Sequence, residues 1–185
     1  MSTTWSVRAI TRAMLPVLLI LTLVELGSGL VLGRFESTLL RYPSLLVLVP
    51  VTIGTAGNLG SILAARLSTA FHLGTLSFAA DDETLAGNAV ATVALAASIF
   101  PLVGLGAWGL TALAGSTNLP LSTVLAVSVA SGLSLAVLAV LVTVVATYAA
   151  YRFELDPDDV VIPVVTNVCD VLGVVLLYLA VLLFV

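Results

Sequence analysis

The chain has 185 residues, of which 61% are hydrophobic and only 9% are charged. A soluble domain normally carries about 25% charged residues, so this composition argues against a water-soluble globule. The formal net charge is −4, and a nucleic-acid-binding face needs clustered cations, so nucleic acid is excluded as a main partner. The single cysteine, Cys169, excludes an intrachain disulfide framework and a multi-cysteine metal site. We therefore expect an integral membrane protein.

Charged and turn-forming residues divide the chain into five apolar stretches, and a membrane-crossing helix needs roughly 20 such residues. Residues 84–151 contain no charge, and as one helix they would be about 100 Å long, so they must fold back. The turn signal is GSTNLP at 115–120. We predict an all-α integral membrane protein with five transmembrane helices, forming a single domain over residues 1–185 without a separate soluble domain. The expected spans are about 14–33, 44–71, 85–114, 121–150 and 160–185.

The arginines indicate how the chain is oriented in the membrane. Five spans place the two termini on opposite sides, and four of the six cationic residues then lie on the side of the N-terminus. These four are Arg8, Arg12, Arg66 and Arg152, against Arg34 and Arg41 on the other side. The positive-inside rule therefore favours a cytoplasmic N-terminus, in a multi-pass protein of the cell membrane.

Two acidic residues lie inside the predicted spans, Glu25 in the first and Asp170 in the fifth. Because lipid makes ionisable groups expensive, an acid at membrane depth is a candidate functional residue. For Asp170 the alternative is a packing role between helices. Three roles stay open for Glu25: a second contact to the cation, a titrating group in a coupled transporter, and a packing acid bonded to Ser28. At 100° per residue the fifth span carries a polar stripe, made of Asp159, Pro163, Thr166, Asn167, Asp170 and Gly173.

The second span carries a face of small residues with Asn58 at its margin. Such a face lets helices approach closely in lipid. It also leaves room for backbone carbonyls and water to line a passage, and both interpretations stay open. The face is made of Pro50, Gly54, Gly57, Ser61, Ala64 and Ser68.

The polar groups of these two spans favour a particular class of ion. Carboxylate, amide, hydroxyl and carbonyl oxygens are hard donors, which suit Mg²⁺ and Ca²⁺ rather than soft metals. Mg²⁺ keeps much of its water and binds through one or two carboxylates. A two-fold homodimer that brings two Asp170 side chains to its axis would supply two negative charges, which we expect one protomer alone cannot do. We expect Asn58, Thr166 and Asn167 to contact the water shell of the ion, and we expect no cofactor other than a bound ion such as Mg²⁺.

Two segments resemble the MgtE family of magnesium transporters. Residues 50–74 read PVTIGTAGNLGSILAARLSTAFHLG, and residues 156–178 read DPDDVVIPVVTNVCDVLGVVLLY. The first is similar to the family's Gly-Asn motif in the second helix, and the second to its Asp-Pro…Pro…Thr…Asp-x-x-Gly pattern around the fifth. The motif GNL…ARLST, together with TLAGN at residues 84–88, is more similar to the eukaryotic solute-carrier branch of the family than to the bacterial branch.

The resemblance implies a parallel homodimer whose pore lies between the second and fifth helices of the two protomers. It implies that Asp170 binds magnesium, that Gly57 and Asn58 are the second-helix motif, and that Thr166 and Gly173 belong to the fifth-helix motif together with Pro163. Two positions depart from the bacterial pattern at the proposed lining. These are Ile62 in place of Gln and Asn167 in place of a second Thr, and they leave the choice between Mg²⁺, Ca²⁺, Mn²⁺ and Co²⁺ open.

Our main hypothesis is therefore divalent-cation transport by a homodimeric channel or transporter, with Mg²⁺ as the first choice. The alternative is a proton- or sodium-coupled divalent-cation exchanger that uses Glu25. A more remote alternative is an intramembrane enzyme of lipid metabolism. Its acids would have to come from the cluster of Asp156, Asp158 and Asp159, and no Ser–His or Glu-x-x-His arrangement accompanies them. We therefore expect no enzymatic activity. A membrane scaffold is the last option.

Overall fold

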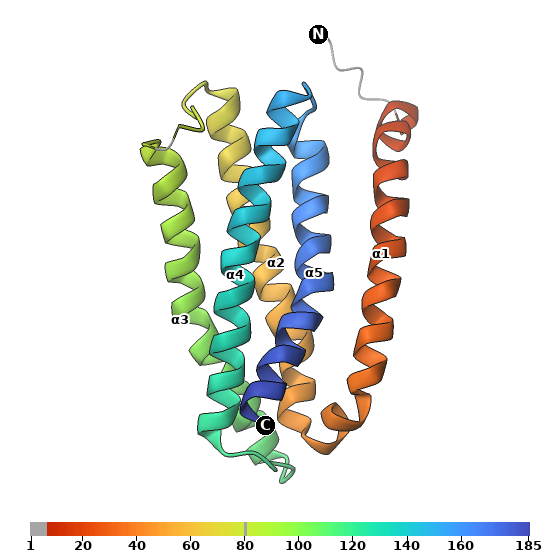
Figure 1. The fold of residues 1–185 in the computed structure, drawn as a ribbon, viewed down its shortest axis with the longest axis vertical. Coiled ribbons are helices and arrows are strands. Elements are labelled where there is room, and N and C mark those ends of the chain that lie inside the picture. Colours follow the sequence, from red (N-terminus) through yellow and green to blue (C-terminus); the bar gives the residue numbers. More distant parts are fainter. Residues whose placement is uncertain (1–6, 80) are drawn as a thin grey trace.

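The computed structural model describes residues 7–79 and 81–185, and over these residues five long helices run side by side (Figure 1). All five are long and apolar enough to cross a membrane, α1 over its part Met14–Arg41. The prediction of an all-α protein with five membrane-spanning helices is confirmed for the described part of the chain. The helices are α1 (Val7–Arg41), α2 (Pro43–His72), α3 (Glu83–Leu113), α4 (Leu121–Arg152) and α5 (Pro157–Phe184).

The first helix continues past Gly33, the expected end of its span, to Arg41. Its 35 residues correspond to about 52 Å, more than the hydrocarbon core of a bilayer. Between Gly33 and Pro43 the chain has no proline or glycine, and Pro43 has no backbone N–H to continue the helical ladder. Pro43 instead begins α2 at a first-turn position where the missing N–H costs nothing. Tyr42 alone therefore separates the two helices.

Glycines end two of the other helices. Gly74 follows α2 and Gly115 follows α3, each with φ of +68°. This left-handed conformation lets the next N–H groups turn back to the last helical carbonyls, and Thr75 donates to Ala70 while Ser116 donates to Thr111. A residue with a Cβ would be strained at either position. The two turns bring α3 back along α2, and α4 back along α3.

The fifth helix lies at the centre of the bundle and packs against α1, α2 and α4. Helix α3 packs against α2 and α4, whereas α1 stands at one edge and packs mainly on α5 (Figure 1). None of the residues in the most apolar window of α1 is buried, against 44% for α2. The position of α1 therefore depends chiefly on what it contacts on α5.

Two glycines mark the closest approaches between helices. A Cβ placed on Gly60 of α2 would overlap the side chain of Val165 on α5, and one placed on Gly132 of α4 would overlap the ring of Phe100 on α3. Van der Waals packing is a main source of helix association in lipid, and small residues permit it. At Gly60 this close packing holds α2 against Val165 of α5, the residue before Thr166 of the polar stripe.

Candidate metal site

The structure brings the two membrane-depth acids together. The carboxyl groups of Glu25 on α1 and Asp170 on α5 lie within hydrogen-bonding reach of each other, and both side chains are half-buried. The hydroxyl of Ser28 donates to the backbone carbonyl of Glu25 at 2.8 Å. Because Ser28 bonds the backbone and not the carboxylate, it does not explain why the acid is present.

This pairing corrects one expectation from the sequence. A single protomer was expected to be unable to supply two carboxylates, but Glu25 and Asp170 of one chain supply them. Two carboxylates held this close in a low-dielectric medium repel each other when both are ionised. A divalent cation between them would offset both charges, and a shared proton would offset one, so the pair can take either.

Thr166 lies on the side of α5 that meets the small-residue face of α2. Its Oγ1 donates to the carbonyl of Ile162 at 2.9 Å and lies 3.1 Å from the Oγ of Ser61. A Cβ on Gly57 would lie 3.8 Å from the Cγ2 of Thr166, which is ordinary contact. Packing within one chain therefore does not require glycine at 57. The polar stripe thus faces α2 at Thr166 and α1 at Asp170.

Asn167 presents an unused oxygen next to these groups. Its Nδ2 donates to the carbonyl of Pro163 at 3.2 Å. Its Oδ1 is buried and has no hydrogen-bond partner among the described residues. Pro163 has no N–H, so the carbonyl of Asp159 also lacks its helical donor. A buried acceptor without a partner calls for an explanation, and a water or the water shell of an ion supplies one.

The remaining predicted site residues have different surroundings. Asn58 is exposed on α2, so the bundle of one chain does not enclose it. Gly173 is buried, and a Cβ there would lie 2.9 Å from Cγ1 of Ile53 and 3.1 Å from Cδ2 of Leu135. The structure gives Gly173 a packing role between α5, α2 and α4. Its contact with an ion stays a prediction.

The donor set at this site fits a hard, hydrated cation. Among the described residues, no three side chains of His, Cys, Asp and Glu gather as a metal-binding group. Mg²⁺ typically binds through one or two carboxylates and retains water, whereas closed transition-metal sites need more protein ligands. Two carboxyls with neighbouring hydroxyl and amide oxygens therefore agree better with Mg²⁺ than with Zn²⁺.

Sequence reasoning named both acids but did not pair them, and it placed Ser61 in a small-residue face that serves either helix packing or the lining of a passage. A signal was available, because Glu25 and Asp170 each lie near the midpoint of their helices. Two acids at the same depth of one small bundle are candidates for contact.

Comparison with known proteins shows the family. A family model described as divalent cation transporter, MgtE, matches residues 49–180, which is well over half of the 185-residue chain. The chain belongs to the MgtE family. The match covers most of α2, all of α3 and α4, and most of α5, including the predicted motifs of the second and fifth helices. None of the curated proteins compared with the chain matches it.

Membership of the MgtE family supports divalent-cation transport as the function of this multi-pass membrane protein, and the family is one of transporters, not of enzymes. The resemblance seen in the motifs around Asn58 and Asp170 is thereby confirmed at the level of the family. The match does not distinguish branches, and the greater similarity to the eukaryotic branch stays a prediction. Glu25 lies outside the matched residues, so its pairing with Asp170 comes from the fold.

Proposed function

We propose that two copies of this chain form a parallel homodimer that transports Mg²⁺, as a channel or transporter, along a path between α2 and α5 of the two protomers. The observation that carries the ion site is the Asp170–Glu25 pair at the middle of the bundle; the dimer has separate support on α2. In this proposal Asp170 holds the partly hydrated ion. Asn58, Thr166 and Asn167, with freed backbone carbonyls near Pro163, contact its water shell.

Exposed polar groups on α2 support the dimer. Asn58 and Gly54 are exposed in a single chain, as is the peptide backbone that a glycine does not cover. Facing lipid, the side-chain amide of Asn58 would have no hydrogen-bond partner, which is costly at membrane depth, whereas the backbone at Gly54 is bonded within its own helix. A second copy that covers this face of α2 would place the same groups along a protein-lined, hydrated path.

The site is tested by measuring Mg²⁺ flux into liposomes that contain the purified protein and a magnesium-sensitive dye. We expect Asp170→Asn to abolish flux because it removes the charge that holds the ion. Asp158→Asn is the matched control, since Asp158 is an exposed acid in the first turn of the same helix. It should leave the flux at the wild-type rate. Normal flux through correctly folded Asp170→Asn would refute the site.

The dimer needs its own test, because an ion could bind within one protomer. Wild-type and Asp170→Asn chains are mixed in known ratios, allowed to exchange and reconstituted together. If the path is shared and each dimer needs two intact acids, flux should fall as the square of the wild-type fraction. A linear fall would show that each chain conducts alone, and would refute the shared path while leaving the role of Asp170 intact.

The position of Glu25 favours a second candidate function, coupled exchange. An acid within reach of the ion-holding carboxyl is where a driving proton or sodium ion would compete with the divalent cation. The discriminating measurement is Mg²⁺ flux under an imposed proton or sodium gradient, with no magnesium gradient. Coupled exchange predicts flux that Glu25→Gln abolishes. An uncoupled channel predicts none.

We propose that the protein lies in the plasma membrane with its N-terminus in the cytoplasm. Its support is the arginine distribution between the two ends of the bundle, because cytoplasmic ends carry the excess of cations. The end at which α1 begins and α2 and α4 finish has Arg8, Arg12, Arg66 and Arg152, and the other end has Arg34 and Arg41. A tag on the N-terminus should resist protease added outside intact cells. Cleavage of the tag would show that the N-terminus lies outside and would refute the proposed orientation.

A further inference from the structure

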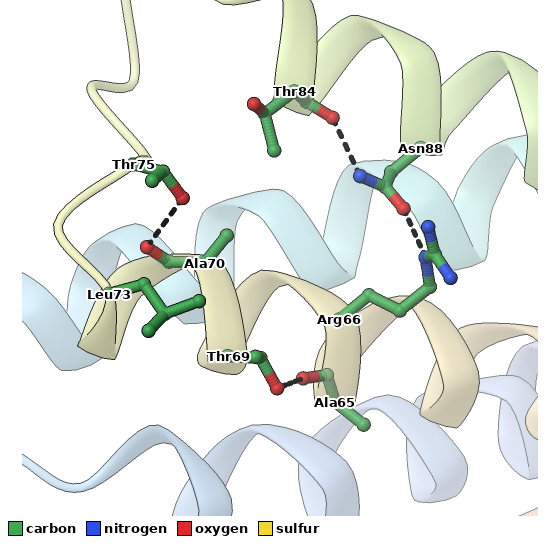
Figure 2. A pocket seen from close by; sticks show the side chains of 8 residues that line it. All are labelled: Ala65, Arg66, Thr69, Ala70, Leu73, Thr75, Thr84 and Asn88. Atoms are coloured by element: carbon green, nitrogen blue, oxygen red, sulfur yellow. Dashed lines mark hydrogen bonds between the residues drawn. The ribbon is translucent and has the colours of Figure 1, made fainter.

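A pocket of about 470 Å³ opens between the last turns of α2 and the first turns of α3. Figure 2 shows Arg66 and Thr69 reaching it from α2, Thr84 and Asn88 from α3, and Leu73 from the end of α2. None of these residues belongs to the proposed ion path on the α5 side of α2. The pocket therefore requires a separate explanation.

Arg66 supplies the charge of this pocket. Its Nε–H donates to the Oδ1 of Asn88 (Figure 2), and the Nδ2 of Asn88 donates to the carbonyl of Thr84 at 2.7 Å. The guanidinium is thus held by a neutral amide that is itself fixed on α3. Asp82, the acid that caps α3, directs its carboxylate to Ser77 and Leu85. Within residues 7–79 and 81–185 the hydrogen-bond partner of Arg66 is therefore a neutral amide, and the two Nη groups make no hydrogen bond there, so they can take a ligand.

The other polar side chains of the pocket bond their own backbone. The hydroxyl of Thr69 donates to the carbonyl of Ala65 at 2.9 Å, and that of Thr75 donates to Ala70 at 3.1 Å (Figure 2). These hydroxyl protons are not directed at a ligand. Recognition of an anion here would thus depend on the planar guanidinium of Arg66, whose geometry matches a phosphate group.

The depth of Arg66 points to lipid. The 30 residues of α2 span about 45 Å, close to the thickness of a bilayer with its headgroups. Arg66 lies six residues before the end of α2 at His72, or about 9 Å along the helix, which is headgroup depth. Leu95, seven residues after Asn88 and thus on the same face of α3, is 49% exposed on the membrane-centre side of the pocket. A cation above an apolar surface suits a phospholipid and not a free anion.

We propose that this pocket binds an anionic phospholipid, with the phosphate on the Nη groups of Arg66 and an acyl chain along Leu95. Basic pockets between transmembrane helices at a membrane surface are known to take anionic headgroups. The Arg66–Asn88 bond sets the guanidinium in place before the lipid arrives, so less side-chain freedom is lost on binding.

The test uses the full chain purified in detergent, with bound lipid measured by native mass spectrometry. Phosphatidylglycerol should be retained in preference to phosphatidylcholine with the same acyl chains. We expect Arg66→Gln to lower retention of phosphatidylglycerol about tenfold, the loss expected for a charge-assisted hydrogen-bond pair. Arg152→Gln, at an exposed arginine in the last turn of α4 at the same end of the bundle, is the matched control and should leave retention unchanged.

Three results would overturn the proposal. Equal losses in Arg66→Gln and Arg152→Gln would show general attraction to a charged surface. Displacement of phosphatidylglycerol by an equal concentration of inorganic phosphate would show a site for free anions. A photoactivatable phosphatidylglycerol on the unsubstituted protein should crosslink to α3 near Leu95 or α2 near Arg66, and crosslinks confined to other helices would refute the site even if Arg66→Gln does not fold.

Discussion

Replacing Gly60 by alanine is expected to lower both the stability of the bundle and its transport rate. The added Cβ would overlap Cγ1 of Val165 and lie 3.4 Å from the Cβ of Ala139. Valine has essentially one side-chain rotamer in a helix, so the overlap is relieved by moving α5 and not by rotating Val165. Such overpacking typically costs about 1–3 kcal/mol, and alanine in place of a helical glycine returns about 1 kcal/mol. We therefore expect a net loss of up to about 2 kcal/mol. Because Val165 precedes Thr166, the shift also moves the Thr166 hydroxyl from its position 3.1 Å from Ser61.

Thermal unfolding of the purified chain in detergent measures the stability change. For a chain of this size, 1 kcal/mol corresponds to about 2–4 °C in Tm, so we expect Gly60→Ala to unfold at a temperature lower by up to about 8 °C. Gly106→Ala is the matched control on α3, because a Cβ there would have no atom within 4 Å. It should unfold at the wild-type temperature or above. Adding Val165→Ala to Gly60→Ala removes the overlapping methyl groups and should recover part of the loss.

The reasoning would be refuted by a Tm of Gly60→Ala that equals or exceeds that of Gly106→Ala. It would also be refuted if the effects of Gly60→Ala and Val165→Ala simply add. Residues in contact should show a coupling energy in such a cycle, whereas independent sites do not.

Two further predictions concern hydrogen bonds outside the ion site. The buried hydroxyl of Ser128 donates to the carbonyl of Phe100 at 2.8 Å, so Ser128→Ala should lower the free energy of unfolding by about 1 kcal/mol; Ser98→Ala, at an exposed serine that bonds its own helix, should not change Tm. The N–H of Leu85, followed by that of Ser77, lowers the pKa of Asp82 below its ordinary value. The stabilisation from Asp82 should thus be complete above about pH 4 and be lost as the pH falls through the lower folded-state pKa. The Tm difference between wild type and Asp82→Ala should follow that course, and a difference independent of pH down to acid would contradict it.

The number and type of helices could be predicted from the sequence because the bilayer imposes them. Long uncharged stretches must form helices that satisfy their own backbone groups, and a stretch such as 84–151 is too long to cross once. The ends of the helices were less well predicted. Helix α1 continues to Arg41, because hydropathy indicates where a helix enters lipid but only a breaker such as Pro43 indicates where it stops.

The site could be predicted in its residue types and only partly in its arrangement. The polar stripe on α5 was visible from helical periodicity, and the structure places Thr166 against Ser61 as neighbouring faces of α2 and α5 require. Gly173 belongs to the same stripe, yet it is buried against Ile53 and Leu135. Periodicity places residues on a common face, but it does not show which neighbouring helix each of them meets.

The amino-acid sequence by itself determined that this is a five-helix membrane protein of the MgtE family with an acid at the middle of its last helix, because composition, helical period and local motifs act over a few residues at a time. Only the tertiary structure decided that Glu25 and Asp170 meet, that α5 occupies the centre of the bundle, and that Arg66 is held by Asn88 at a pocket. Glu25 and Asp170 lie on the first and last helices, at opposite ends of the sequence. Their contact therefore depends on how all the helices pack, which is a balance of many small van der Waals contacts that no single segment of the chain encodes.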